Sequence, residues 1–172
     1  MDFFEAVYRR RSVRRFKREK IPEEAVRRIM EAGRAAPTDA TLHLWSAVWV
    51  RDEAKKAEIA NLIGQPHVEE GSDFFVFLAD LYRLEELLRY RRRQLASNRL
   101  ALFVFAAVDA ALAAENMALA ATAMGYGSCF IGAVQNAVEE LVELLRLPRL
   151  AYPLFGPVSY THLRAHETRH DL

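Results

Sequence analysis

The run at residues 73–79, D-F-F-V-F-L-A, constrains the fold most because almost every one of its residues is apolar. A strand points successive side chains to opposite faces of its sheet, so a run without alternation is apolar on both faces. Such a strand requires a sheet that is covered on both sides, usually by helices. A second short run, W-S-A-V-W-V at residues 45–50, is rich in strand-forming residues and also predicts a buried strand.

Caps, breakers and apolar spacing indicate the helices that would cover this sheet. Asp2, with Glu5 three residues later, predicts the start of a first helix. Pro22 predicts the start of a second helix, which Pro37 ends. Residues 104–124 contain ten alanines and no Gly or Pro, so we expect the longest and most buried helix there. Further helices are expected at residues 55–63, 81–95 and 138–145, and further strands at 128–134 and 150–155.

Composition and charge narrow the class of protein. The chain has 172 residues, 52% of them hydrophobic, which suits one domain with a substantial core. A net charge of +1 argues against a nucleic-acid-binding domain. No continuous apolar span and no signal peptide is evident, so we expect no membrane segment and a cytoplasmic location. The single cysteine, Cys129, is expected to be a small buried apolar residue rather than a nucleophile.

Residues 6–16 hold five arginines and one serine. Guanidinium groups make paired, charge-assisted hydrogen bonds to phosphate oxygens, and Arg10, Arg11, Ser12 and Arg14 could converge on one phosphate. A solvated basic turn, or a patch that touches nucleic acid non-specifically, explains the same run. A second arginine run, within residues 83–93, is read as the solvated face of an amphipathic helix, with a groove for a dinucleotide phosphate as the alternative.

The first arginine run is followed by I-P-E-E-A-V-R-R-I-M-E-A-G-R-A-A-P-T and then by W-S-A-V-W-V. In this order and spacing the motifs resemble the nitroreductase family, in its branch of NADPH-dependent nitro- and flavin reductases, over about residues 2–156. The resemblance implies an α+β fold with a mostly antiparallel sheet flanked by helices, incomplete at its C-terminus. It also implies FMN as cofactor and NAD(P)H as electron donor. The electron acceptors would be nitroaromatics, quinones or free flavin, and the assembly a homodimer with the flavin at the subunit boundary.

The resemblance also assigns site residues. Arg10, Arg11, Ser12 and Arg14 match the positions that bind the FMN phosphate, and Gln65 matches a glutamine at the polar edge of the flavin ring. Three residues match a loop that lies against the ring: Ile131, Gly132 and Ala133.

Where the family more often has serine, asparagine and glutamine before the tryptophan, this chain has Asp39, Thr41 and His43, which we also place at the flavin. His43 could donate to the flavin or to substrate, with a structural histidine as the alternative, and the Asp39 carboxylate is expected to point away from the reduced ring. Gln135 replaces a common arginine, which puts a phosphate contact to NADPH in doubt. No catalytic side chain and no metal is expected, because the chemistry would belong to the flavin.

Residues 157–172 do not continue the family pattern, and we expect a non-native, unpacked tail after a domain at residues 1–156. His162, His166 and His170 are spaced four residues apart, which leaves a metal site on one helix face as a weak alternative. Two other functions stay open: a flavin-binding homologue without turnover, and a small basic-patch nucleic-acid binder.

Overall fold

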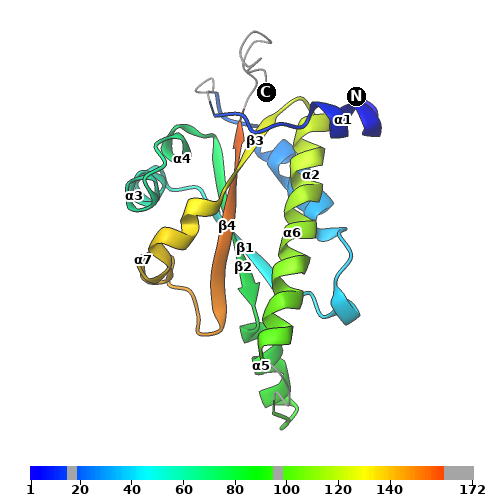
Figure 1. The fold of residues 1–172 in the computed structure, drawn as a ribbon, viewed down its shortest axis with the longest axis vertical. Coiled ribbons are helices and arrows are strands. Elements are labelled where there is room, and N and C mark those ends of the chain that lie inside the picture. Colours follow the sequence, from blue (N-terminus) through cyan, green and yellow to red (C-terminus); the bar gives the residue numbers. More distant parts are fainter. Residues whose placement is uncertain (15–18, 95–98, 161–172) are drawn as a thin grey trace.

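The structure is a computed structural model that describes residues 1–14, 19–94 and 99–160. Its centre is an antiparallel four-stranded sheet in the order β1-β2-β4-β3 (Figure 1). The strands are β1 (Trp45–Val50), β2 (Asp73–Asp80), β3 (Gly127–Ile131) and β4 (Ala151–Tyr160). The helices are α1 (Phe3–Arg9), α2 (Glu23–Arg34), α3 (Glu53–Ile63), α4 (His67–Glu70), α5 (Tyr82–Tyr90), α6 (Arg99–Ala123) and α7 (Val138–Leu144), with two 3₁₀ helices, η1 (Asp39–Thr41) and η2 (Gly132–Ala137). The expected α+β class is confirmed.

Strand β2 is buried along its whole length, as its apolar run predicts. Phe74 and Val76 point into a core formed with α3, η2 and α7, whereas Phe75 and Phe77 point into a second core with α2 and α6. Helices therefore cover both faces of the sheet, and Figure 1 shows α3 and α7 on the side opposite α6. The expectation that residues 45–50 form a buried strand was too strong: β1 pairs only with β2 at the edge of the sheet, and Val50 alone is fully buried.

Helix α6 is the longest described helix, as expected, but it is buried on one side only. It packs closely on α2, where a Cβ added to Gly33 would lie 2.7 Å from Cγ of Met117. Large apolar residues are exposed on the opposite side of α6 at helical spacing. Four of them are here called the α6 apolar face: Val104, Phe105, Val108 and Leu112.

By length and composition, α6 is the one described helix that could cross a membrane, with a mean hydropathy of 1.6. The core helix of a globular domain passes the same test, and the alanine side of α6 lies against α2 and the sheet. That side also carries the carboxylate of Asp109, which is hydrogen-bonded inside the protein. We therefore describe α6 as a core helix with one exposed apolar face.

Element boundaries follow local hydrogen bonds. The predicted cap of α1 is confirmed, because the Glu5 amide donates to Oδ1 of Asp2 at 2.8 Å. Helix α5 ends at Tyr90 rather than at residue 95, and the chain turns at Arg92 with φ 53°. Strand β3 ends at Ile131, since the last residues of the expected strand form η2.

Strand β4 continues beyond the expected residue 155 as far as Tyr160, and it pairs with both β2 and β3 after Gly156. Ladder pairing on two sides holds this backbone in place. The expected domain end at residue 156 thus falls inside a strand. Residues 161–172, with the three spaced histidines, lie outside the described residues, so the nature of this tail remains a prediction.

Candidate functional site

The arginine turn, residues 10–14, lies against the first residues of β3. The Val13 amide donates to the Ser128 carbonyl at 3.0 Å, and Ser12 and Ser128 form a parallel bridge. Gly127 permits this approach, since a Cβ there would lie only 3.0 Å from a methyl carbon of Val13. A side chain at position 127 would therefore push the arginine turn away from the sheet.

The polar side chains of the arginine turn face outward. Arg11, Ser12 and Arg14 are exposed, whereas Arg10 is partly buried, with its Nε 3.7 Å from Oε1 of Glu115 on α6. Three cationic groups and a hydroxyl thus lie within five residues, and such groups have the chemistry to bind an anion. Arg15, the last arginine of the run, lies outside the described residues.

Arg14 lies within electrostatic reach of His67 at the start of α4 and of Cys129 on β3. Burial lowers the pKa of His67, and the Arg14 charge lowers it further, so the imidazole is mainly neutral at pH 7. Burial raises the pKa of the Cys129 thiol, although the charge of Arg14 and hydrogen bonds from Ser12 and Arg14 oppose that rise. The positive charge here therefore belongs to the arginines.

Cys129 is expected to resist thiol reagents in the folded chain. Only 1% of the residue is exposed, and its raised pKa keeps the thiol protonated at pH 7–8, whereas the thiolate is the reactive form. Ellman's reagent should therefore titrate one thiol in denaturant and almost none in native buffer. Rapid modification of the native chain at pH 7.5 would contradict the buried placement of Cys129.

At its other end, β3 delivers the chain to Gly132, the first residue of η2. Gly132 is exposed, and a Cβ added there would meet no heavy atom within 4 Å. Ile131 is buried and Ala133 packs against the same core, so the backbone at Gly132 is fixed while its outer side is open. From Ser128 to Gly132 the strand advances by about 13 Å. The arginine turn and the open glycine thus lie at the two ends of β3, whose own residues are buried or partly buried. This strand with its two exposed ends is here called the track along β3.

Gln65 follows α3, which ends at Gly64 with φ 65°. The backbone N–H of Gln65 donates to the Ala60 carbonyl at 2.9 Å, which fixes the backbone of the turn. Among the described residues the side-chain amide of Gln65 makes no hydrogen bond, so it remains able to donate and accept. Helix α3 packs on η2, so Gln65 and Gly132 belong to elements on the same face of the sheet.

Gln135 has a structural role that sequence reasoning missed. Its Nε2 donates to the carbonyls of Pro153 at 2.7 Å and Leu154 at 2.5 Å, and its Oε1 accepts from the Tyr152 hydroxyl at 2.8 Å. The side chain therefore closes η2 onto β4 and is not free to hold a phosphate. The sequence around Gln135 gives no sign of these contacts, because both acceptor carbonyls lie on the later strand β4.

The structure does not bring Asp39, Thr41 and His43 to this track. They lie in η1 and the loop after it, with exposed side chains, and the loop is held to α6 by Asp109. In Figure 1 this segment, coloured cyan, lies beside α6 on the side away from α3 and α7. The residues assigned to one flavin thus fall into two groups that are separated within a single chain.

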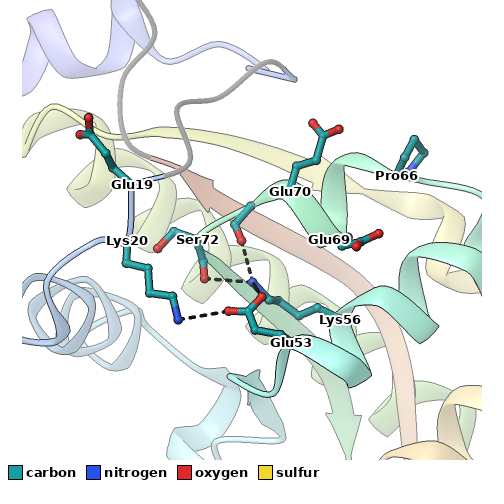
Figure 2. A pocket seen from close by; sticks show the side chains of 9 residues that line it. Glu19, Lys20, Glu53, Lys56, Pro66, Glu69, Glu70 and Ser72 are labelled. Atoms are coloured by element: carbon teal, nitrogen blue, oxygen red, sulfur yellow. Dashed lines mark hydrogen bonds and ion pairs between the residues drawn. The ribbon is translucent and has the colours of Figure 1, made fainter.

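A cavity of about 480 Å³ lies elsewhere, between α3, α4, the start of β2 and residues 19–20 (Figure 2). Lys56 is 2% exposed and donates to the carbonyls of Gly71 at 2.7 Å and Ser72 at 3.3 Å. It also pairs with Glu53 at 2.9 Å, and this hydrogen bond is the main reason that the pKa of Glu53 is lowered. Figure 2 shows the Lys20 ammonium directed at the same Glu53 carboxylate.

The cations of this cavity are therefore already paired, while further carboxylates line its wall: Glu19, Glu69 and Glu70. Such a lining does not suit a phosphate. Within residues 1–14, 19–94 and 99–160, no cluster of three potential metal ligands occurs.

Comparison with known proteins agrees with the α+β fold. The model of the nitroreductase family matches residues 7–158. "FMN reductase (NADPH)" from Bacillus subtilis (strain 168) is 36% identical over 155 residues, which cover 88% of this chain and 62% of the relative. "NADPH-dependent oxidoreductase" from Staphylococcus aureus (strain USA300) is also 36% identical over 155 residues, covering 89% of this chain and 62% of the relative. The chain thus spans about three fifths of the length of these relatives.

Solved structures give the same result. The NfrA1 nitroreductase from B. subtilis superposes with a TM-score of 0.92 at 32% identity, over 99% of this chain and 70% of that one. The NADPH:FMN oxidoreductase from Vibrio harveyi, complexed with NAD+, gives a TM-score of 0.88 at 32% identity, over 99% of this chain and 73% of that one. Because the family model matches most of this chain, the chain belongs to the nitroreductase family.

Proposed function

We propose that this chain binds FMN and belongs to an NAD(P)H-dependent reductase of flavins, nitroaromatics or quinones. The observation that carries the proposal is the track along β3, with exposed cationic groups at one end and an open glycine backbone about 13 Å away at the other. An elongated molecule with a phosphate at one end and a flat ring at the other suits this layout. The relatives' names, FMN reductase (NADPH) and NADPH-dependent oxidoreductase, support the same chemistry.

Each residue of the track has a proposed task. Arg11, Ser12 and Arg14 would donate hydrogen bonds to phosphate oxygens, and neutral His67 adds no positive charge of its own at pH 7. Gly132 leaves its outer side open for a ring, and the Gln65 amide would donate to and accept from the polar groups at the ring edge. When bound, FMN would supply the hydride chemistry between NAD(P)H and the oxidant. The protein binds and orients the reactants.

We further propose that two chains form a homodimer through the α6 apolar face. Val104 and Val108 are 49% and 51% exposed, and Phe105 and Leu112 are each 41% exposed, which makes a contiguous apolar stripe unusual for a monomer surface. The loop with Asp39, Thr41 and His43 is held to the same helix. Pairing two copies of α6 would let this loop reach the flavin of the second copy and so reunite the separated groups.

Placing a charge on the α6 apolar face is expected to dissociate the dimer. Val108→Glu would bury an unpaired carboxylate from each subunit, at a cost of about 3 kcal/mol for each charge, or about a hundredfold in affinity per charge. Leu87→Glu is the matched control, because Leu87 is 55% exposed but lies on α5. Sedimentation velocity should show a dimer for the parent and control and a monomer for Val108→Glu. A parent chain that is monomeric at every concentration would rule out this interface.

The function is tested by adding FMN to the purified chain and following NADPH consumption with a quinone or nitroaromatic as acceptor. We expect bound flavin with a visible spectrum, and NADPH oxidation that depends on both flavin and acceptor. A chain that binds FMN without oxidising NADPH would support the flavin-binding homologue without turnover. A chain that binds no FMN would overturn the proposal. A cytoplasmic location is part of the proposal, consistent with one buried free cysteine.

A further inference from the structure

The loop at residues 39–43 has a strained backbone. Ala40, Thr41 and His43 have φ values of 45°, 57° and 51°, in the left-handed region that residues with a side chain rarely adopt. These are half of the six such non-glycine residues in the described part of the chain, gathered within four positions. All three are exposed, so packing of their own side chains does not impose this conformation. Some other contact must hold the loop.

One buried carboxylate joins the two ends of this loop. Asp109 on α6 is 2% exposed; its Oδ1 accepts from the Asp39 amide at 2.9 Å, and its Oδ2 accepts from the Leu44 amide at 3.4 Å. Leu44 is itself buried, at 1% exposure. A carboxylate among apolar neighbours is stable only when hydrogen-bonded, and the loop supplies both donors that the structure records for it. The Asp109 carboxylate therefore fixes the two ends of the loop, and the two loop amides stabilise the buried carboxylate.

Arg83 at the start of α5 holds the same loop from its C-terminal end. Its guanidinium donates to the carbonyl of His43 and, at 3.2 Å, to that of Trp45. The Arg83 Nε also lies 3.5 Å from the carboxylate of buried Asp80. Both flanks of the loop are thus fixed, and the three strained residues between them project into solvent.

We propose that Asp109 is a positioning residue that holds loop 39–43 in its left-handed conformation and so presents Thr41 and His43 to the flavin bound by a second copy of the chain. This inference rests on the proposed function. Its geometric basis is that Asp109 directly follows Val108 of the α6 apolar face. The same turn of α6 thus carries Val108 of the α6 apolar face and the Asp109 carboxylate that holds the loop. Without the hydrogen bonds from Asp109, the loop is expected to relax toward ordinary backbone angles and turn Thr41 and His43 away from the flavin.

The hydrogen bonds between Asp109 and the loop are tested without flavin. Asp109→Asn keeps the size of the side chain but replaces one acceptor oxygen by a donor amide, which cannot accept from a second backbone N–H. Hydrogen exchange at the Asp39 and Leu44 amides should become about tenfold faster. Thr122→Val is the matched control: Thr122 is also buried on α6, but its hydroxyl donates only to Ala118 within the helix. Unchanged exchange in Asp109→Asn would overturn the inference.

The role toward flavin is tested by FMN titration of the same variants. Asp109→Asn should bind FMN about tenfold more weakly, whereas Thr122→Val should match the parent. Adding Ala40→Gly to Asp109→Asn should recover part of the affinity, because glycine adopts positive φ without strain. Because glycine at a positive φ also changes the stability of the whole protein, urea denaturation of the same variants is needed to separate a local effect on FMN binding from a general one.

A pair of substitutions at exposed Ala40 keeps the test decisive if Asp109→Asn does not fold. Ala40→Val makes positive φ costlier and should weaken FMN binding, while Ala40→Gly alone should leave it unchanged. Equal FMN affinity for both variants and the parent would overturn the inference. If Arg14→Ala still weakens FMN binding in that case, the proposed function survives the loss of this inference; a parent chain that binds no FMN overturns both.

Discussion

Arg14→Ala is expected to weaken FMN binding about thirtyfold, because removing a charged donor to a phosphate costs about 2 kcal/mol. Arg14 is exposed beside β3, within reach of Cys129 and His67, and nothing in the described protein neutralises its charge by an ion pair. Arg11→Ala should behave in the same way. Fluorescence quenching of FMN during titration with each variant measures the effect.

Arg92→Ala is the control for this prediction. Arg92 is also exposed but lies just past the end of α5, away from β3. It should therefore bind FMN as the parent does. If Arg11→Ala, Arg14→Ala and Arg92→Ala all bound FMN like the parent, the phosphate would lie somewhere other than the arginine turn.

Gly156→Ala is expected to lower the free energy of unfolding by about 3 kcal/mol. A Cβ at this position of β4 would lie 2.3 Å from Cε2 and 2.4 Å from Cζ of Phe74, and 2.6 Å from the carbonyl oxygen of Phe75. Phe74 is fully buried, and the Phe75 carbonyl belongs to the neighbouring strand β2, so neither atom can move away without disturbing the core or the sheet. Urea denaturation followed by circular dichroism measures the loss.

Gly132→Ala is the matched control, and it should change FMN binding rather than stability. Its new Cβ would meet no atom within 4 Å, so its stability should lie within about 0.5 kcal/mol of the parent. FMN binding should nevertheless weaken, because the methyl group would occupy the space proposed for the flavin ring. Equal stability of Gly156→Ala and the parent would show that β4 does not lie this close to Phe74.

The fold could be predicted to the extent that local patterns determine it. The apolar run in β2 indicated two covered faces, and Asp2 with Glu5 indicated the cap of α1. The edge position of β1 could not be predicted, because the order of strands depends on pairings between distant segments. The length of α5 was overestimated because its amphipathic pattern continued, whereas residues 91–94 are exposed and the chain turns at Arg92.

The residues proposed for the site come from the sequence, and their binding of a flavin stays a prediction. The structure places the arginine turn and Gly132 at the two ends of β3. The separation of Asp39, Thr41 and His43 from that strand could not be read from a single sequence. Local sequence also gave no sign of two contacts between distant residues: Gln135 to the backbone of β4, and Asp109 to a loop about seventy positions earlier.

The most direct test of the account compares FMN with riboflavin, which lacks only the phosphate, in titrations of the 172-residue chain. If the arginine turn binds the phosphate, the parent should bind FMN at least about thirtyfold more tightly than riboflavin. In Arg14→Ala this difference should shrink, while riboflavin affinity stays the same. Equal affinity of the parent for FMN and riboflavin, or an undiminished difference in Arg14→Ala, would contradict the phosphate site on which the account depends.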